Sequence, residues 1–124
     1  MIELKLINKS YGNQKILDKI SLNIKKGEFI SIVGPSGAGK TTLLNIIGTI
    51  EDFDKSEKSK FLINSQDITK LSDKNLSKFR NDNIGFVFQF HQLLPELTVE
   101  ENILLPTMIK GDEKDSSDKY FIEL

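Results

Sequence analysis

The sequence predicts an α/β fold in which N-terminal antiparallel strands precede the start of a parallel core. Three observations lead to this prediction. Apolar and polar residues alternate over residues 2–24, as in half-buried strands, and an apolar run at residues 29–33 ends at a glycine-rich loop. Directly after the loop, from Lys40, the apolar spacing becomes that of a helix. The functional interpretation depends on this order of strand, loop and helix.

Two half-buried strands are predicted at the N-terminus. The first alternation covers residues 2–6 and the second covers residues 16–24, with a break at Tyr11-Gly12-Asn13 between them. Residues 29–33 are nearly all apolar and precede Gly34, which is typical of a buried parallel strand. The apolar face of the helix after the loop is formed by Leu43, Leu44, Ile46, Ile47 and Ile50.

The middle of the chain is predicted to alternate loops with short elements. Residues 51–60 are highly charged and lack a helical period, which predicts a loop whose charges are solvated, before a strand at residues 61–64. Ser72 is placed to cap a helix over residues 73–82. Residues 84–88 then return to an apolar strand pattern.

A capped helix is predicted next. Thr98 and Glu101 have the spacing of a capping box, so the helix should begin at Val99. Because proline lacks the backbone donor, we expect Pro106 to strain or end this helix, which should stop by Gly111.

Composition excludes several classes of protein. The chain has 124 residues and 14.1 kDa, enough for one small domain or a piece of a larger one. Seventeen basic and eighteen acidic residues give a net charge of -1, which disfavours nucleic-acid binding. Without Cys there is no disulfide or thiolate chemistry, and no apolar run approaches the roughly 20 residues that would insert into a bilayer. We expect a cytoplasmic protein.

The glycine-rich loop carries the chemistry. Residues 34–41 read Gly-Pro-Ser-Gly-Ala-Gly-Lys-Thr, which fits the phosphate-binding pattern of a glycine, four residues and Gly-Lys-Thr. Glycines let the backbone turn so that N–H groups converge on an anion, and the helix presents its positive end to the phosphates. Lys40 should reach the β- and γ-phosphate oxygens, Thr41 should bind Mg²⁺, and Thr42 should support it.

An aromatic residue precedes the loop. Tyr11 lies in the first turn, where its ring can stack on a nucleotide base, an interaction worth about 1–3 kcal/mol. The ordinary alternative is a tyrosine at the edge of the core. The full set of expected nucleotide contacts is Tyr11, Ile16, Gly34, Pro35, Ser36, Gly37, Ala38, Gly39, Lys40, Thr41 and Thr42.

Two alternatives stay open on the residues alone. The loop also resembles that of guanylate kinases, which are nucleotide monophosphate kinases, although there it lies close to the N-terminus and here 33 residues come first. The other alternative is a non-catalytic truncated module that binds a membrane partner.

Taken together, Tyr11, the loop at 34–42 and Phe86-Val87-Phe88-Gln89 resemble the ATP-binding subunit of ABC transporters. The resemblance implies a P-loop NTPase of the ABC ATPase type that binds ATP and Mg²⁺ and hydrolyses ATP as a homodimer. It implies that Tyr11 stacks on adenine and that Gln89 contacts Mg²⁺ and the attacking water. Lys40 and Gln89 are thereby candidate catalytic residues, and Thr41 and Gln89 are candidate metal ligands.

The segment from Phe88 to Asn102 looks most like the lipoprotein-releasing branch of this family, with macrolide-export and cell-division relatives nearby. The resemblance implies docking to transmembrane permease subunits through about Phe90 to Pro106, on the inner face of the cell membrane. The simpler alternative is a loop that faces the core. The only histidine, His91, is not assigned a catalytic role.

The resemblance covers residues 1–124 as an incomplete nucleotide-binding domain. It places the phosphate-binding loop at 34–42, the glutamine loop near 89 and the start of a helical subdomain at about 99–124. The sequence contains no Leu-Ser-Gly-Gly-Gln-like signature and no apolar strand ending in Asp-Glu. We therefore expect this chain alone to be hydrolytically incompetent and to leave the apolar edges of its core strands bare.

Overall fold

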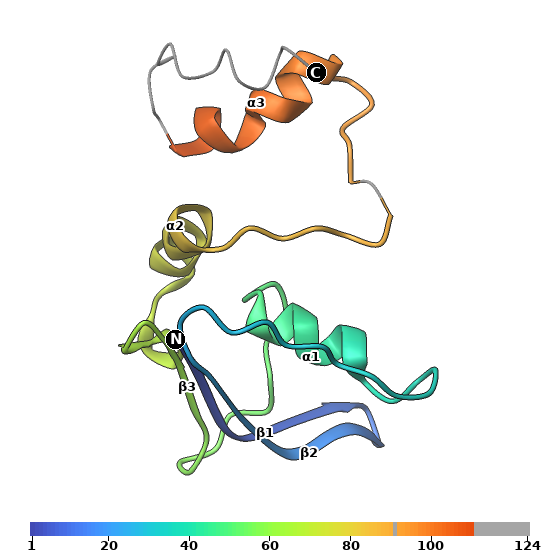
Figure 1. Cartoon of the computed structure of the whole chain (residues 1–124), viewed down its shortest axis with the longest axis vertical. Coiled ribbons are helices and arrows are strands. Elements are labelled where there is room, and N and C mark those ends of the chain that lie inside the picture. Colours follow the sequence, from blue (N-terminus) through green and yellow to red (C-terminus); the bar gives the residue numbers. More distant parts are fainter. Residues whose placement is uncertain (91, 111–124) are drawn as a thin grey trace. The chain divides into compact units, whose positions relative to one another are not determined.

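The computed structural model describes residues 1–90 and 92–110. These residues divide into two compact units, one spanning Met1–Leu76 and the other beginning at Ser77 (Figure 1). The first unit contains the sheet and the glycine-rich loop.

The first unit is built on a four-stranded antiparallel sheet of order β2-β1-β3-β4. The two strands predicted at the N-terminus are confirmed, but they are longer than residues 2–6 and 16–24, and Tyr11, predicted to lie in the turn, is the last residue of the first strand. They form a hairpin whose turn contains Gly12, at a positive φ of 56°. The strands are β1 (Ile2–Tyr11), β2 (Gln14–Ile24), β3 (Lys60–Ile63) and β4 (Gln66–Asp67).

Bulges bend the hairpin of β1 and β2. The register shifts three times between Leu4 and Ser10, and Leu6 and Lys19 both have φ of 52°. Two side chains bind the backbone donors there: the Leu6 N–H donates to Ser21 Oγ at 3.0 Å, and the Lys19 N–H donates to Asn8 Oδ1 at 2.9 Å. The local bends are therefore specified by side chains and are not frayed pairing.

Helix α1 (Lys40–Ile47) packs along one face of this hairpin (Figure 1). Of the predicted apolar face, Ile46 is fully buried and Leu44 is 46% exposed, whereas Ile50 lies beyond the end of the helix and is 40% exposed. Phe53 and Phe61 add an edge-to-face aromatic contact with ring centroids 6.3 Å apart. The buried apolar residues of this unit are Leu4, Ile7, Leu17, Ile46, Phe53, Phe61, Ile63 and Ile68.

Two capped helical segments follow the sheet. In η1 (Ile68–Lys70), Asp67 accepts hydrogen bonds from the Thr69 N–H at 3.0 Å and the Thr69 hydroxyl at 2.6 Å. Helix α2 (Asp73–Asn83) begins after Ser72, whose Oγ accepts from the Asn75 N–H at 3.4 Å, which confirms the predicted cap.

The second unit contains α3 (Val99–Lys110), which begins where the capping box predicted. The Thr98 N–H donates to Glu101 Oε2 at 2.8 Å, and the Glu101 N–H donates to Thr98 Oγ1 at 3.2 Å. Of the two expected effects of Pro106, strain or an end, the end is not observed, because the helix continues to Lys110. Proline withdraws a single backbone donor, the one that would bond the Asn102 carbonyl, so the helix loses one hydrogen bond and can continue. The expected stop at Gly111 lies outside the described residues.

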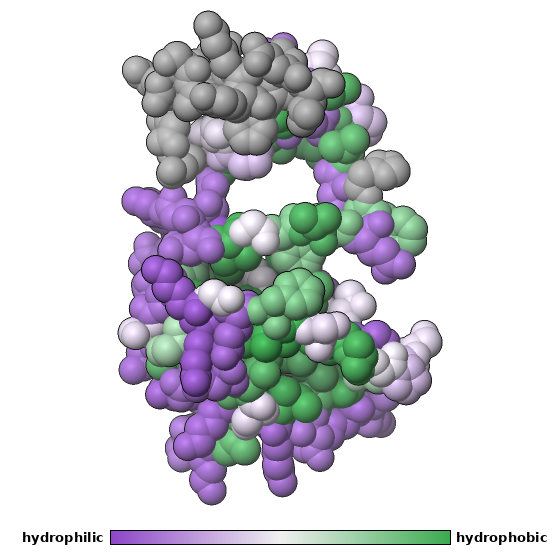
Figure 2. All heavy atoms as spheres, viewed as in Figure 1, coloured by the Kyte–Doolittle hydropathy of each residue, from purple (hydrophilic) through white to green (hydrophobic). Residues whose placement is uncertain are grey.

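Two predicted core strands are not strands in this structure. Residues 29–33 and 84–88 have no strand pairing among the described residues. Their apolar side chains are exposed: Phe29 by 93%, Val33 by 85% and Val87 by 93%. The physical reason is that a parallel strand needs hydrogen-bonding neighbours, and the described residues supply none. Figure 2 shows hydrophobic residues reaching the surface among polar ones.

No helix in the described ranges combines the length and the hydropathy that a bilayer crossing requires. The longest, α3, has 12 residues.

Candidate nucleotide-binding site

The glycine-rich loop closes against the hairpin through Gly39. This residue has φ of 85°, and a Cβ placed on it would lie 2.9 Å from Leu17 Cδ2, 3.0 Å from Ile16 Cγ2 and 3.2 Å from the Ile16 carbonyl oxygen. A side chain is therefore excluded both by the backbone conformation and by the space. The phosphate-binding pattern therefore requires glycine at position 39, because a side chain there would collide with the hairpin.

Ile16 takes part in this contact because of a bulge. The register passes from Lys9 opposite Leu17 to Ser10 opposite Lys15, so Ile16 is the extra residue of β2. The structure thus places the predicted contact Ile16 directly behind the loop, where its carbonyl and side chain support Gly39.

The loop presents backbone donors at the start of α1. Within the loop, the Ala38 N–H donates to the Pro35 carbonyl at 3.3 Å, and the first helical bond runs from the Leu43 N–H to the Gly39 carbonyl at 2.9 Å. Within residues 34–47, all of which are described, no side chain caps Gly39 and no acidic residue lies in the first turn of α1. The helix start is therefore a positive, uncapped end suited to an anion.

Lys40 bridges the loop. Its Nζ donates to the Gly34 carbonyl at 2.9 Å and to the Pro35 carbonyl at 2.7 Å. An ammonium has three donors, so one is left after these two bonds. The two carbonyl bonds hold the cation over the loop, beside the uncapped helix start.

The two threonines after Lys40 differ in surroundings. Thr41 is exposed, whereas Thr42 is half-buried near the hydroxyl of Tyr11. Among the described residues, no group of three or more His, Cys, Asp or Glu side chains could hold a metal ion. A divalent cation here would depend on the Thr41 hydroxyl and on oxygens of the ligand that it accompanies.

Tyr11 ends β1 and is tied to the segment after α1. Its hydroxyl donates to Glu51 Oε1, and the same carboxylate oxygen lies 3.1 Å from Lys9 Nζ. Lys9 Nζ also lies 5.0 Å from the centroid of the Tyr11 ring. Tyr11 remains 49% exposed.

Glu51 corrects one expectation from the sequence. Residues 51–60 were predicted to carry solvated charges, yet the Glu51 side chain is only 22% exposed and the Lys9 side chain only 14%. The reason is that the turn after α1 brings Glu51 beside the end of β1. Sequence reasoning did not identify Lys9 and Glu51 as site residues. The one available signal concerned Lys9, which stands two residues before Tyr11, the spacing at which two side chains share one face of a strand.

The cluster shifts two pKa values in opposite directions. The hydrogen bond to Glu51 raises the pKa of the Tyr11 hydroxyl above 10.0, with desolvation acting in the same sense. The same hydrogen bond, aided by Lys9, lowers the pKa of Glu51 below 4.5. Neutral Tyr11 and ionised Glu51 are thus the forms that the fold favours.

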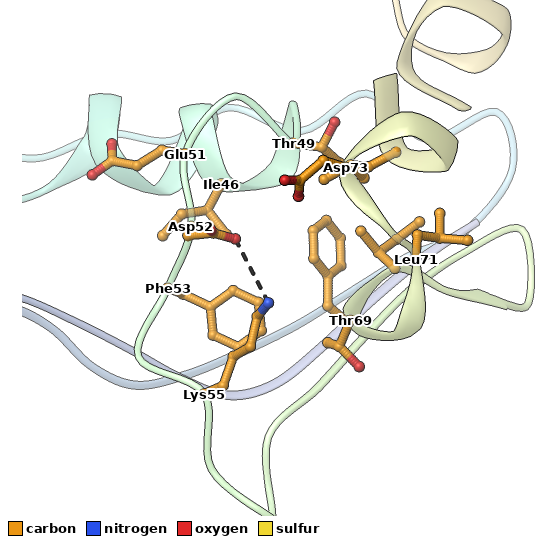
Figure 3. Close-up of a pocket in the computed structure, with 12 residues that line it drawn as sticks. Ile46, Thr49, Glu51, Asp52, Phe53, Lys55, Thr69, Leu71 and Asp73 are labelled. Carbon is orange, nitrogen blue, oxygen red and sulfur yellow. Dashed lines mark ion pairs between the residues drawn. The ribbon is translucent and has the colours of Figure 1, made fainter. Parts of the chain in front are cut away.

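A cavity elsewhere in the first unit does not suit a nucleotide. It lies beside the C-terminal end of α1, near Phe53, Phe61 and Leu71, with the Asp52–Lys55 ion pair of 3.8 Å alongside (Figure 3). Its volume of about 60 Å³ falls far below the roughly 300–1,000 Å³ of typical ligand sites. It has room for a few water molecules.

The remaining candidate, Gln89, belongs to the second unit and is exposed. The structure brings together Tyr11, Ile16 and residues 34–42, but it does not relate Gln89 to them. His91 lies outside the described residues.

The second unit carries an apolar groove of about 260 Å³ near the start of α3, formed by Leu93, Leu94, Pro95, Leu97, Val99, Asn102 and Ile103. Asn102 shapes it: Oδ1 accepts from the Leu94 N–H at 2.8 Å, and Nδ2 donates to the carbonyls of Leu94, Leu97 and Thr98 at 3.1, 3.1 and 2.9 Å. One amide side chain thus fixes the turn that precedes α3.

Comparison with known proteins identifies the class that this fold and loop define. Residues 17–123 match the family described as ABC transporter, and the chain belongs to that family. It resembles a solved structure of MJ0796, described as a bacterial ABC transporter cassette, with a TM-score of 0.83 and 42% identity over 96% of this chain and 52% of that one. The predicted α/β fold of the ABC ATPase type is thereby confirmed.

More particularly, the chain is similar to the lipoprotein-releasing system ATP-binding protein LolD of Bacteroides thetaiotaomicron, with 48% identity over 124 residues. It is 42% identical over 125 residues to the bacitracin export ATP-binding protein BceA of Halalkalibacterium halodurans. The alignments cover 100% and 98% of this chain but 56% and 48% of those proteins. The chain therefore spans about half the length of these relatives.

The contact behind Gly39 leads to a first prediction. Gly39→Ala should destabilise the fold by about 1–3 kcal/mol and weaken binding of inorganic tripolyphosphate, because the new Cβ pushes the loop off the hairpin. Gly12→Ala is the matched control, since Gly12 also has positive φ but nothing lies within 4 Å of its Cβ position. Urea unfolding and calorimetric titration measure both effects; equal losses in the two variants would contradict this account.

The Tyr11–Glu51 pair leads to a second prediction, on pH. The raised Tyr11 pKa contributes stability that is present below pH 10.0 and is lost as pH rises through the folded value. The lowered Glu51 pKa contributes stability that is present above pH 4.5 and is lost as pH falls through its folded value. Tyr11→Phe should therefore unfold with a flatter pH dependence at both limits, as measured by urea titration at a series of pH values. Coincident profiles would show that the pair is not coupled to folding.

Proposed function

We propose that the protein binds ATP at residues 34–42 and, as a complete protein, hydrolyses it to power an ABC transporter of the lipoprotein-releasing or a related export type. The observation that most directly supports this proposal is the geometry of the loop. The start of α1 is uncapped, Gly39 is packed without space for a side chain, and Lys40 bonds the loop carbonyls. Membership of the ABC transporter family supports the same function, and a related structure of MJ0796 is described as bound to ADP and Pi.

In this proposal different residues of the site bind the phosphates, the Mg²⁺ ion and the base. The first-turn N–H groups of α1 and the loop would receive the phosphates, and Lys40 would exchange its two carbonyl partners for phosphate oxygens. Thr41 would supply one oxygen to Mg²⁺, whose chemistry is to neutralise phosphate charge. Ile16 would support the loop from behind, and Tyr11 would carry the base.

Gln89 is proposed to contact Mg²⁺ and to orient the attacking water, together with Lys40 as the catalytic pair. A neutral amide both accepts and donates hydrogen bonds, so it can hold a water without adding charge. In this proposal residues 1–124 form part of a nucleotide-binding domain, with the glutamine loop near residue 89 and the start of a helical subdomain at about 99–124. The second half of such a domain, and a homodimer, would complete the hydrolytic site; the MJ0796 cassette is described as dimeric.

The segment Phe90 to Pro106 is proposed to dock onto transmembrane permease subunits at the inner face of the cell membrane. Support comes from its exposed apolar side chains, among them Phe90 at 72% and Leu93 at 62%, and from the groove that Asn102 holds in shape. An exposed apolar groove of this kind suits a partner segment of apolar character.

Nucleotide binding is tested at Lys40. In the full-length protein, Lys40→Ala should weaken ATP binding about 10- to 100-fold, because a charge-assisted hydrogen bond is worth about 1.5–3 kcal/mol, and should abolish turnover. Lys58→Ala is the matched control, since Lys58 is exposed in the loop before β3. Calorimetry and phosphate release provide the readouts. Unchanged ATP affinity in Lys40→Ala would refute the proposal.

Docking is tested with two exposed apolar residues of similar accessibility. Leu93→Ser should reduce rebinding of the full-length protein to stripped membranes of its source organism, measured by sedimentation, because it removes an apolar anchor from the groove. Met108→Ser is the control, since Met108 is 64% exposed on α3 but lies beyond the proposed segment. Equal rebinding of the two variants would count against the assignment.

A further inference from the structure

The environment of Tyr11 contains a carboxylate that the proposed function leaves without a role. Glu51 accepts the Tyr11 hydroxyl hydrogen bond and lies 3.1 Å from Lys9 Nζ. Lys9 Nζ also donates to the Asp52 carbonyl at 2.7 Å. The Lys9 and Glu51 side chains are mostly buried, whereas the ring they hold is half-exposed.

Glu51 is itself anchored to the helix that begins at the phosphate-binding loop. The N–H groups of Ile50 and Glu51 donate to the Asn45 carbonyl at 2.9 and 3.3 Å. Because Asn45 lies in α1, the helix that carries the phosphate-binding residues also fixes the acceptor of the Tyr11 hydroxyl.

This arrangement fixes the Tyr11 ring at both ends. The backbone of β1 holds one end, and the hydroxyl bond to Glu51 holds the other, so rotation about the side-chain torsions is restricted. Lys9 Nζ lies over one face of the ring at 5.0 Å from its centroid, while the ring remains 49% exposed. A base would therefore use the face that Lys9 leaves open.

Charge balance makes a carboxylate tolerable beside the ring that is proposed to carry the base. An isolated Glu51 would repel the nucleotide, but Lys9 pairs with it and cancels the charge locally. The pair thus supplies a strong acceptor for the tyrosine hydroxyl without a net negative field.

We propose that Glu51, paired with Lys9, is a positioning residue that holds the Tyr11 ring at a set distance from the phosphate-binding loop, so that the ring is preorganised for the adenine base of ATP. This inference rests on the proposed function, because it presupposes that Tyr11 stacks on the base. Preorganisation raises affinity by removing the cost of ordering the ring on binding.

The test compares two probes on the full-length protein: ATP, which has a base, and inorganic tripolyphosphate, which has none. Calorimetry gives both affinities. Glu51→Ala should weaken ATP binding about 3- to 10-fold while tripolyphosphate binding stays within about twofold, because only part of the stacking energy is lost. Glu51→Gln, which keeps an acceptor for the hydroxyl, should restore part of the ATP affinity.

Tyrosine variants provide the internal check. Tyr11→Phe keeps the ring and loses the hydroxyl, so it should match Glu51→Ala, and the double variant should be no weaker than either single one. Asp52→Ala is the matched control for the carboxylate, because the Asp52 side chain is 84% exposed and lies next in sequence. It should leave both affinities unchanged.

The outcomes separate this inference from the proposed function. If Tyr11→Ala leaves the ratio of ATP to tripolyphosphate affinity unchanged, stacking itself is wrong and the inference falls with it. If Tyr11→Ala lowers the ratio but Glu51→Ala and Tyr11→Phe do not, stacking stands and the positioning role is overturned. An equal loss for both probes in Glu51→Ala would also overturn it, because that result describes general destabilisation of the loop. If the Glu51→Ala protein does not fold, the ratio of ATP to tripolyphosphate affinity in Tyr11→Phe alone decides whether the positioning role stands.

Discussion

The close approach of the Gly39 backbone to the β1–β2 hairpin is the constraint on which the rest of the site depends. Leu17 and the bulged Ile16 leave no space for a side chain at Gly39, so the loop turns through a left-handed backbone and α1 begins at once. This junction sets the direction of α1, and with it the position of the helix start, of Lys40 and of the segment that follows the helix. The hairpin therefore supports the phosphate-binding loop from behind.

Local patterns in the sequence predicted the elements whose physics is local. Period-two alternation located β1 and β2, the change of period located α1, and side-chain spacing located the caps at Ser72 and Thr98. The phosphate-binding loop was predictable because its pattern of glycines, lysine and threonine is specific, although the contact that excludes a side chain at Gly39 is made with Ile16 and Leu17. For the caps the interacting residues are three positions apart, so the spacing in the sequence contains the interaction.

Features that depend on distant neighbours were not predictable in this way. The apolar run at 29–33 predicted a buried strand, but hydrogen-bonded neighbours decide whether a run becomes one, and the described residues provide none. Glu51 looked like one charge in a solvated loop because its partners, Lys9 and Tyr11, lie about 40 residues away in the chain. Such contacts leave no periodic signature.

Asn102 has a further consequence, which concerns folding kinetics. All its hydrogen-bond partners lie within eight residues, so the turn from Leu94 to Thr98 closes through contacts that are entirely local. Closing so short a loop costs little chain entropy and takes far less time than pairing the strands of β1 and β3, which are nearly 60 residues apart. The apolar groove beside α3 should accordingly acquire its shape early in folding, before the sheet that carries the phosphate-binding loop is complete.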